Sequence, residues 1–421
     1  MREHGRYHTG VVSPFMSDVE KLAAVRAGLP ALAAGIYLNT GSVGPLPSET
    51  ARAVTDMEAY ELATGRASVG YFHEFIDRMA EARAGVAAVL TTDVDTIALN
   101  HATTDGMNIA VWSIDWRPGD VAVTTQHEHP GGVGPLYALR DRAGIQVTFV
   151  AIANDDDDDT IVASFEHAIL PSTRLVALSH ILWTTGRLMP VERIAEVAHA
   201  RGARVVIDGA QSAGAIPLDV AATGADLYAV PAQKWLLGPE GMGALWCSPT
   251  ILDRAMVAFA GYYSFAASDS MGTATLHPSA RRLESSSWHR PSVVGFARSL
   301  GWLSMYVGLE FVYRRGAELA RRARAGLAAI PGVDVLTPRD RMAGLVSFRI
   351  GGWPCQDALD ELGARVFAVA RVVPLIDALR ISVGFFNSED EIDRFIDSVR
   401  LLADHEPGTL PRRSLTVLGD S

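Results

Sequence analysis

Short apolar runs alternate with amphipathic segments through the middle of the chain. The runs with strand character are Thr96–Asn100, Val121–Gln126, Gln146–Ile152, Arg174–Ile181, Arg204–Ala210, Asp226–Val230 and Met242–Cys247. Between several of them the apolar period is helical, as in Pro190–Gly202, where Ile194, Val197 and Ala198 share one face. Near-continuous apolar strands separated by helices predict an α/β fold, with a mostly parallel central sheet flanked by helices.

The pattern changes after residue 290. A helical period runs from Pro291 to Ile330, and the short strand-like segments Gly344–Ile350 and Ala378–Gly384 follow. A final helix begins after Ser388, with Glu391 three residues on, as in a capping box. We therefore expect a smaller C-terminal α+β domain.

These patterns divide the chain into three ranges. We expect an N-terminal segment at 1–35 that packs near the small domain, a large domain at 36–290 and the small domain at 291–421. A length of 421 residues, of which 48% are hydrophobic, is enough for two domains with buried cores.

Charge and cysteine content argue against several classes of function. The net charge of −11 disfavours a nucleic acid or an anionic membrane as partner, since both select basic surfaces. Residues 1–12 lack the apolar core of a secretory signal, and no uncharged run reaches the ~18 residues of a membrane span. Cys247 and Cys355 fit neither a disulfide framework nor a metal pair, which predicts a reducing, cytoplasmic location.

The acidic run "NDDDDDT" at 154–160 has two interpretations. A calcium loop alternates its acids and has a central glycine, and this run has neither feature. A solvated turn is the favoured interpretation, and we expect no metal site.

Two groups of polar residues fall next to predicted strands. Asp208, at the end of its strand, and Gln211 shortly after it lie where α/β sheets bind ligands, although an acid there also caps helices. Thr103 and Thr104 precede a predicted helix, where hydroxyls and free amides either bind a phosphate or form an ordinary N-cap.

Two histidines and a lysine complete the candidate set. His127 and His129 are predicted to alternate along a strand end and so to point the same way. Zinc would need a further ligand at suitable spacing, which leaves His129 as a structural residue or as a planar partner for a ring. Lys234 lies between an apolar run and a glycine-rich turn, where a lysine must lose its charge or have it paired.

One cofactor accounts for all of these groups. Pyridoxal phosphate needs a lysine for its covalent link, an acid at its pyridinium nitrogen, phosphate donors and a flat partner for its ring. Lys234, Asp208, Thr103 with Thr104, and His129 supply them in that order. The sequence therefore predicts a pyridoxal phosphate site at the strand ends.

The order of the motifs resembles the class V aminotransferase family, which includes cysteine desulfurases and isopenicillin-epimerase-like enzymes. The motifs are "YLNTGSVGPLP", "ATTDGMN", "EHPGG", "SHILWTTGRLMPV", "VVIDGAQSAG", "QKWLLGPEGMGALW" and "LRISVGFFNSEDEID". The resemblance spans about Ile36 to Leu402 and implies the fold type I architecture of pyridoxal-phosphate-dependent transferases.

The resemblance also implies a role for each residue at the cofactor. Lys234 corresponds to the lysine that links the cofactor and moves the Cα proton, and Asp208 to the acid that keeps the pyridine nitrogen protonated. Gln211 corresponds to the residue beside the phenolic oxygen. His129 resembles the ring-stacking histidine, which also serves as acid or base. Thr104, with Gln233, resembles the phosphate site.

Two further residues carry implications for the partner and the substrate. Ser287 falls where the family places a hydroxyl that reaches the partner subunit's phosphate, which implies a homodimer with active sites at the interface. Arg380 corresponds to the arginine that clamps the substrate α-carboxylate, a task suited to its bidentate fork.

Three departures from the desulfurases bear on the reaction. Their nucleophilic cysteine has no counterpart in Val366–Asp377, where Arg371 lies near the expected position. Trp183 replaces an asparagine close to the cofactor and is either a pocket residue that reshapes the substrate side or a core residue. Gln233 replaces a histidine that can carry a proton. We therefore do not expect persulfide-forming desulfuration.

The expected function is a β-eliminating C–S lyase acting on an S-substituted cysteine conjugate in secondary metabolism. Enzymes that process cysteine conjugates in lincosamide-type antibiotic pathways are similar in class. A decarboxylation-coupled oxidative deaminase, an epimerase and an aminotransferase remain alternatives. Tyr262 and Tyr263 either form a wall of the substrate site or belong to a polar surface loop.

Two functions from other classes stay open at this stage. A dinucleotide-binding oxidoreductase is disfavoured because no G-x-G-x-x-G follows the first strand. A non-catalytic scaffold is disfavoured by the full set of cofactor residues. A visible absorption spectrum separates both from a pyridoxal phosphate enzyme.

Overall fold

The protein is described by a computed structural model over residues 12–13, 15–285 and 287–411. Its largest sheet has seven strands in the order β2-β8-β7-β6-β5-β3-β4. They are β2 (Ile97–Asn100), β3 (Val121–Thr125), β4 (Gln146–Val150), β5 (Thr173–Ser179), β6 (Arg204–Asp208), β7 (Leu227–Pro231) and β8 (Gly243–Cys247). Of these seven, β8 alone runs in the direction opposite to the other six, so the predicted mostly parallel sheet is confirmed.

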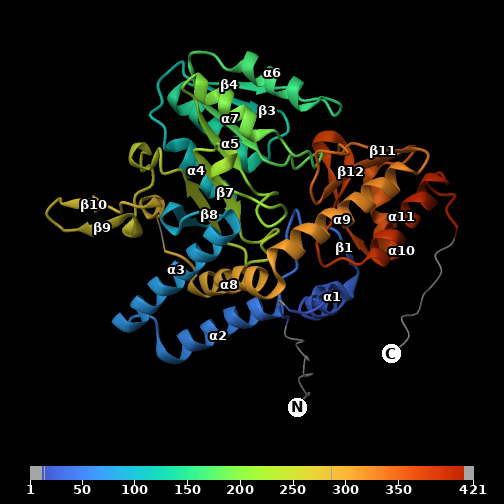
Figure 1. Ribbon diagram of the computed structural model, residues 1–421, viewed down its shortest axis with the longest axis horizontal. Coiled ribbons are helices and arrows are strands. Elements are labelled where there is room, and N and C mark those ends of the chain that lie inside the picture. The colour runs from blue at the N-terminus through green and yellow to red at the C-terminus, as the bar shows by residue number, and fades with distance from the viewer. Residues whose placement is uncertain (1–11, 14, 286, 412–421) are drawn as a thin grey trace.

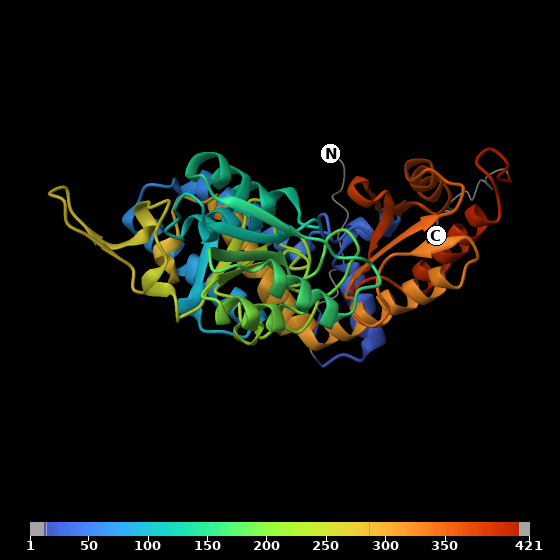
Figure 2. The same ribbon diagram turned by 90° about the horizontal axis from the view of Figure 1, so that it is seen from above.

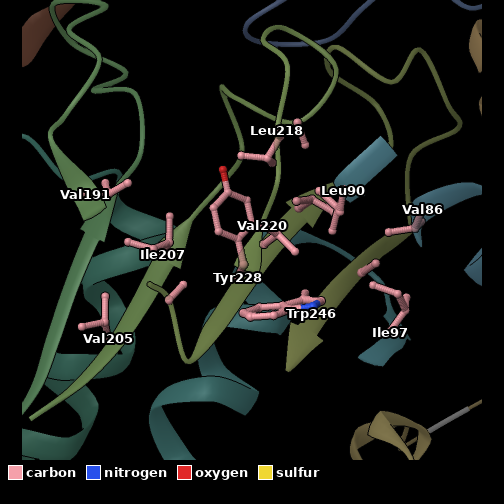
Figure 3. Packing of buried hydrophobic residues seen from close by; sticks show 14 of the residues in the cluster. Val86, Leu90, Ile97, Val191, Val205, Ile207, Leu218, Val220, Tyr228 and Trp246 are labelled. Atoms are coloured by element: carbon pink, nitrogen blue, oxygen red, sulfur yellow. The ribbon is translucent and has the colours of Figure 1, made fainter. Parts of the chain in front are cut away.

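Helices cover both faces of this sheet (Figure 1). They are α2 (Ser48–Thr64), α3 (Val69–Leu90), α4 (Thr103–Trp112), α5 (Pro130–Ala143), α6 (Asp158–Ala168), α7 (Val191–Ala200) and α8 (Arg290–Gly301). On one face Leu90 of α3 and Val191 of α7 belong to the same buried cluster as Ile207 and Trp246 of the sheet (Figure 3). On the other face α4 and α5 pack against the sheet. Burial on both faces explains why the strand sequences are apolar without alternation.

A second, four-stranded sheet lies beside the first and is antiparallel throughout, in the order β11-β12-β15-β14. Its strands are β11 (Val333–Val335), β12 (Leu345–Ile350), β14 (Arg371–Val373) and β15 (Ala378–Ser382). The helices α9 (Leu309–Ala328), α10 (Cys355–Val366) and α11 (Glu389–Ala403) pack around it. This is the smaller α+β unit that the sequence predicts.

Three further segments complete the fold. The helix α1 (Asp18–Ala27) contributes to a cluster with Phe311 and Phe385, and β1 (Ile36–Tyr37) pairs in parallel with β13 (Ala368–Val369). The strands β9 (Phe265–Ser268) and β10 (Ala274–Leu276) form an arm that projects from the molecule (Figures 1 and 2). None of the described helices combines the length and apolar character needed to cross a membrane.

The predicted long helix from Pro291 to Ile330 is wrong in one respect, because the structure divides it. A π-helical turn at Trp302–Val307 follows α8, and Gly308 then takes a φ of 88° before α9 begins. Such a φ is accessible to glycine and strained for other residues. The helix α8 packs on α2 and α3, which cover the large sheet. The domain boundary at 290/291 stays a prediction. The capping box of Ser388 and Glu391 is confirmed.

Candidate active site

A cavity of about 240 Å³ lies at the carboxyl ends of the parallel strands and is also lined by residues of the small sheet. It brings together most of the residues selected from the sequence: Thr103, Thr104, His129, Trp183, Asp208, Gln211, Gln233, Lys234 and Arg380. It also contains Gly41, Ser42 and Arg371, which the sequence did not assign to the site. The topology of an α/β sheet places ligand sites at this edge.

Lys234 lies in the turn after β7 and is one of two lysines in the chain, the other being Lys21. Burial lowers the pKa of Lys234 to about 8; Asp208 opposes this shift, and Arg380 and Arg371 add to it. This amine therefore loses its proton much more readily near physiological pH than an ordinary lysine does. A neutral amine can form a covalent link to a carbonyl cofactor and can accept a proton.

Asp208 and Gln211 are fixed on the same side of the cavity. Asp208 ends β6, and its carboxylate accepts the N–H of Ala210 at 2.9 Å. The amide of Gln211 donates to the carbonyl of Gly41 at 2.8 Å and accepts from the indole N–H of Trp235 at 2.9 Å. Both side chains are buried, so neither is free to turn away from a ligand.

The start of α4 forms an end of the cavity suited to an anion. No side chain caps this helix at Ala102, and the buried hydroxyl of Thr103 has no hydrogen-bond partner. The buried amide oxygen of Gln233 is also unpartnered. A Cβ at Gly131 would lie 2.2 Å from the Thr104 hydroxyl oxygen, so the chain approaches closely here. Free N–H groups and a hydroxyl at a helix N-terminus fit a phosphate.

His129 presents its ring to the cavity from the N-cap of α5. Its Nδ1 accepts the N–H of Gly131 at 3.1 Å, and its ring meets Trp183 edge-on at 5.4 Å. Burial lowers the pKa of His129, with a further lowering from Lys234. The neutral ring therefore carries its proton on Nε2, because Nδ1 acts as an acceptor.

The predicted alternation of His127 and His129 is wrong. The strand β3 ends at Thr125, so His127 lies in the turn after it and His129 is the N-cap of α5. His127 instead bonds the Thr184 hydroxyl at 2.9 Å and the Ile152 carbonyl at 3.1 Å. Strand periodicity does not extend into a turn, which is why the two rings separate.

Two arginines occupy the small-sheet side of the cavity. The register of β14 and β15 places Arg371 directly opposite Arg380. Arg380 is fully buried and donates from Nη1 to the carbonyl of Trp183 at 2.7 Å, while its Nε and Nη2 have no partner. Burial, with Arg371 adding to it, lowers the pKa of Arg380 to about 9, so it stays charged at neutral pH.

Arg371 is half-buried and lies over the Trp183 ring, with its guanidinium 5.6 Å from the ring centroid. It donates to the Ser42 hydroxyl at 3.2 Å. No carboxylate of the described residues forms an ion pair with Arg371 or Arg380. Like charges opposite each other in a sheet are destabilising, so the pair indicates an anionic ligand. The sequence pattern predicts the strand that carries Arg380 but not the short strand that carries Arg371, so it does not indicate this pair.

Two selected residues lie outside the cavity. Ser287 is exposed, and its carbonyl lies 3.4 Å from Nε2 of His101. Tyr262 is 75% exposed at the base of the projecting arm, where its ring packs edge-on against Tyr263 and Phe72. Within one chain neither residue reaches the cofactor site or the substrate site. The prediction that Tyr262 forms a wall of the substrate site is therefore wrong within one chain. A role of Tyr262 across a subunit interface stays a prediction.

The cysteines and the acidic run contribute nothing to the cavity. Cys247 is buried in β8, where burial raises the pKa of its thiol to about 12, and Cys355 begins α10. Among the residues that the structure describes, no group of three or more His, Cys, Asp or Glu side chains could hold a metal ion.

Comparison with known proteins gives a consistent picture. A family model described as aminotransferase class-V matches residues 36–395. The chain is 26% identical to a probable cysteine desulfurase of Methanothermobacter thermautotrophicus, over 90% of this chain and 97% of that protein. It is 30% identical to isopenicillin N epimerase of Streptomyces clavuligerus, over 87% of this chain and 94% of that protein. The solved complex of the cystine C-S lyase C-DES with its reaction product cysteine persulfide matches with a TM-score of 0.84 and 28% identity, over 90% of this chain and 100% of that chain.

Proposed function

The chain belongs to the aminotransferase class-V family, and we propose that within this family it is a C–S lyase that acts on an S-substituted cysteine. Its cofactor is pyridoxal phosphate, for which the cavity supplies a lysine, an acid and a phosphate-binding helix end. When bound, this cofactor withdraws electrons from the Cα of an amino acid. The net reaction converts RS–CH₂–CH(NH₃⁺)–COO⁻ and water into RSH, pyruvate and ammonium.

Each side of the cavity has its own task in this proposal. Lys234 holds the cofactor and, once the substrate has taken its place, accepts the Cα proton, a step for which a pKa of about 8 is suitable. Asp208 holds the proton on the pyridine nitrogen. Arg380 binds the α-carboxylate through its two unpartnered nitrogens, which fixes the direction of the Cα–H bond. The departing thiolate takes up the proton that Lys234 has accepted from Cα, so the elimination releases RSH.

The observation that carries the proposal is a cavity with two arginines and no cysteine. A desulfurase needs a thiol that attacks the substrate sulfur, and Arg371 lies near the position where such a thiol is expected. Without that thiol the sulfur can leave with its substituent. The carboxylate stays bound to a buried arginine throughout, which favours elimination over decarboxylation.

The substrate side favours a substituent larger than hydrogen on the sulfur. Trp183 and Arg371 give this wall an aromatic and a cationic surface next to Arg380. We propose a cysteine conjugate of secondary metabolism as the substrate class. Such a molecule offers both a carboxylate and an extended thioether substituent.

We also propose that the enzyme works as a homodimer. Ser287 and Tyr262 are exposed outside the cavity of their own chain, and Tyr262 stands at the base of an arm that projects away from both sheets (Figure 2). In a homodimer these exposed residues would lie next to the active site of the partner chain. Light scattering of the purified protein tests this, and a monomer that retains full activity contradicts it.

Product analysis with an S-substituted L-cysteine, under air and under nitrogen, tests the reaction. We expect pyruvate and free thiol in equal amounts in both atmospheres. If carbon dioxide and an S-substituted aldehyde form, and only in air, the enzyme is an oxidative deaminase and not a lyase. Loss of optical purity without other products would leave an epimerase. The Lys234→Ala variant is the control and forms none of these products.

A further inference from the structure

We propose that Asp158 and Arg187 are positioning residues for the substrate side of the cavity. In this proposal the acidic run 155–159 acts as an ion-pair latch between the two sheets. Its consequence for the substrate rests on the proposed function, whereas the latch itself does not.

A hairpin of residues 181–188 links the cavity to the small sheet. Ile181 pairs with Leu188 across it, and the N–H of Leu182 donates to the carbonyl of Arg187 at 2.9 Å. Trp183 of this hairpin lines the cavity, and its carbonyl accepts from Nη1 of Arg380 at 2.7 Å. The position of the hairpin therefore sets the position of this carbonyl.

The small sheet holds the tip of the hairpin through side chains. The hydroxyl of Ser347 donates to the Thr184 carbonyl at 2.5 Å, and that of Thr337 donates to the Thr185 carbonyl at 2.5 Å. A Cβ at Gly186 would lie 2.5 Å from the Leu345 carbonyl oxygen, so the backbones approach closely. Small displacements of the tip would break these contacts.

The acidic run holds the hairpin from the other side. The Arg187 side chain is only 4% exposed; it donates to the carbonyl of Asn154 at 3.5 Å and to that of Asp156, and it lies 3.8 Å from a carboxylate oxygen of Asp158. The other oxygen of Asp158 pairs with Arg341, which precedes β12. The Arg341 carbonyl accepts the N–H of Leu188 at 3.0 Å. One carboxylate thus joins the hairpin, the loop before β12 and the start of α6.

Solvent reaches one half of this latch. A cleft of about 540 Å³ is lined by the acidic run together with Arg187, Arg339 and Arg341, and these arginines differ in how far their side chains are exposed to it. Arg341 is 54% exposed, whereas the Arg187 side chain is buried. Salt therefore screens the pair of Asp158 with Arg341 more than its pair with Arg187.

The latch matters because Arg380 has little else to orient it. Among the described residues, its guanidinium has the Trp183 carbonyl as hydrogen-bond acceptor and keeps Nε and Nη2 without partners. A loosened hairpin would let this group rotate while leaving Lys234 and Asp208 on the large sheet in place. The expected defect is thus in recognition of the carboxylate.

Two variants in the same helical turn isolate the effect. Asp158→Asn removes the charge shared by Arg187 and Arg341. Asp159→Asn removes a charge whose partner, Arg193 at 2.7 Å, lies in α7, which packs on the large sheet as α6 does. Both positions lie in the first turn of α6, so the effect of lost charge on the helix itself is matched.

Hydrogen exchange tests the latch without reference to activity. We expect amides of the 181–188 hairpin to exchange at least about tenfold faster in Asp158→Asn and at the wild-type rate in Asp159→Asn. Equal exchange in the wild type and both variants overturns the latch, whether or not the protein proves to be a lyase.

Ligand binding to the holoenzyme tests the positioning role. We expect Asp158→Asn to raise the KM for S-methyl-L-cysteine about tenfold with kcat changed less than about threefold, while the affinity for 2-(methylthio)ethylamine, which lacks the carboxylate, stays unchanged. In the wild type, 1 M NaCl should raise the KM for S-methyl-L-cysteine to a value between those of the wild type and of Asp158→Asn at low salt. Equal losses for both ligands, or an Asp159→Asn variant as defective as Asp158→Asn, contradict a role through Arg380.

Discussion

The two sides of the cavity treat charge in opposite ways. On the large sheet, Lys234 and Asp208 are opposite charges that act on each other, and Asp208 also accepts a backbone hydrogen bond. On the small sheet, Arg371 and Arg380 are like charges placed in register, and no described carboxylate pairs with either. The first arrangement is complete before any substrate arrives, whereas the second lacks an anion.

This difference indicates which occupant belongs to each side. A permanently bound cofactor can be matched by fixed groups, such as the end of α4 and the acid at the end of β6. A substrate that enters and leaves gains more from a charge that only the substrate neutralises. Four variants test whether the cavity is divided in this manner.

Removal of the lysine should have the largest effect. Lys234→Ala should abolish both the yellow colour of the bound cofactor and turnover, because no other lysine lies in the cavity. Circular dichroism should show an intact fold. Turnover at the wild-type rate would show that the covalent link lies elsewhere, and would contradict a cofactor side built around Lys234.

Neutralising the acid of the cofactor side should have the next largest effect. Asp208→Asn should bind the cofactor weakly and lower kcat by about 100-fold or more, since an amide cannot hold the pyridinium proton. Steady-state kinetics with saturating cofactor measures this. If kcat stays close to that of the wild type, Asp208 serves only as the cap that bonds the N–H of Ala210.

On the opposite side, activity and stability should separate. Arg380→Met should weaken substrate binding by about 2–5 kcal/mol, the cost of truncating a buried charge pair. The free energy of unfolding of the cofactor-free protein should stay unchanged or rise by about 1–4 kcal/mol, because a buried unpaired charge is removed. Thermal unfolding and KM measure the two effects. A variant that loses both stability and affinity would show that Arg380 is a structural residue.

Replacement of the cysteines should have the smallest effect. Both thiols are buried outside the cavity, so Cys247→Ser with Cys355→Ser should keep near-normal turnover. The assay is thiol release from an S-substituted cysteine, with mass spectrometry for persulfide. Lost activity in a folded protein, together with persulfide on the wild type, would restore a desulfurase mechanism.

The cofactor side could be predicted from the sequence to a greater extent than the substrate side. Asp208 ends one apolar parallel strand and Lys234 follows another, and parallel strands place their carboxyl ends at one edge whatever the exact register. The meeting of Arg371 with Arg380 depends on the register of two short antiparallel strands, which their sequences do not specify. The division of the long helix at Gly308 and the exposed position of Tyr262 also follow from tertiary packing. The local hydrophobic periodicity of the sequence carries no information about that packing.

The central claim is that the cofactor is linked to Lys234, opposite the arginine pair. Borohydride reduction of the yellow holoenzyme makes this link permanent, and peptide mapping by mass spectrometry then locates it. The chain offers two lysines, so the result is clear. We predict the modification on the peptide that contains Lys234, and none on that of Lys21. Modification of Lys21, or of no lysine after incubation with pyridoxal phosphate, would contradict the account.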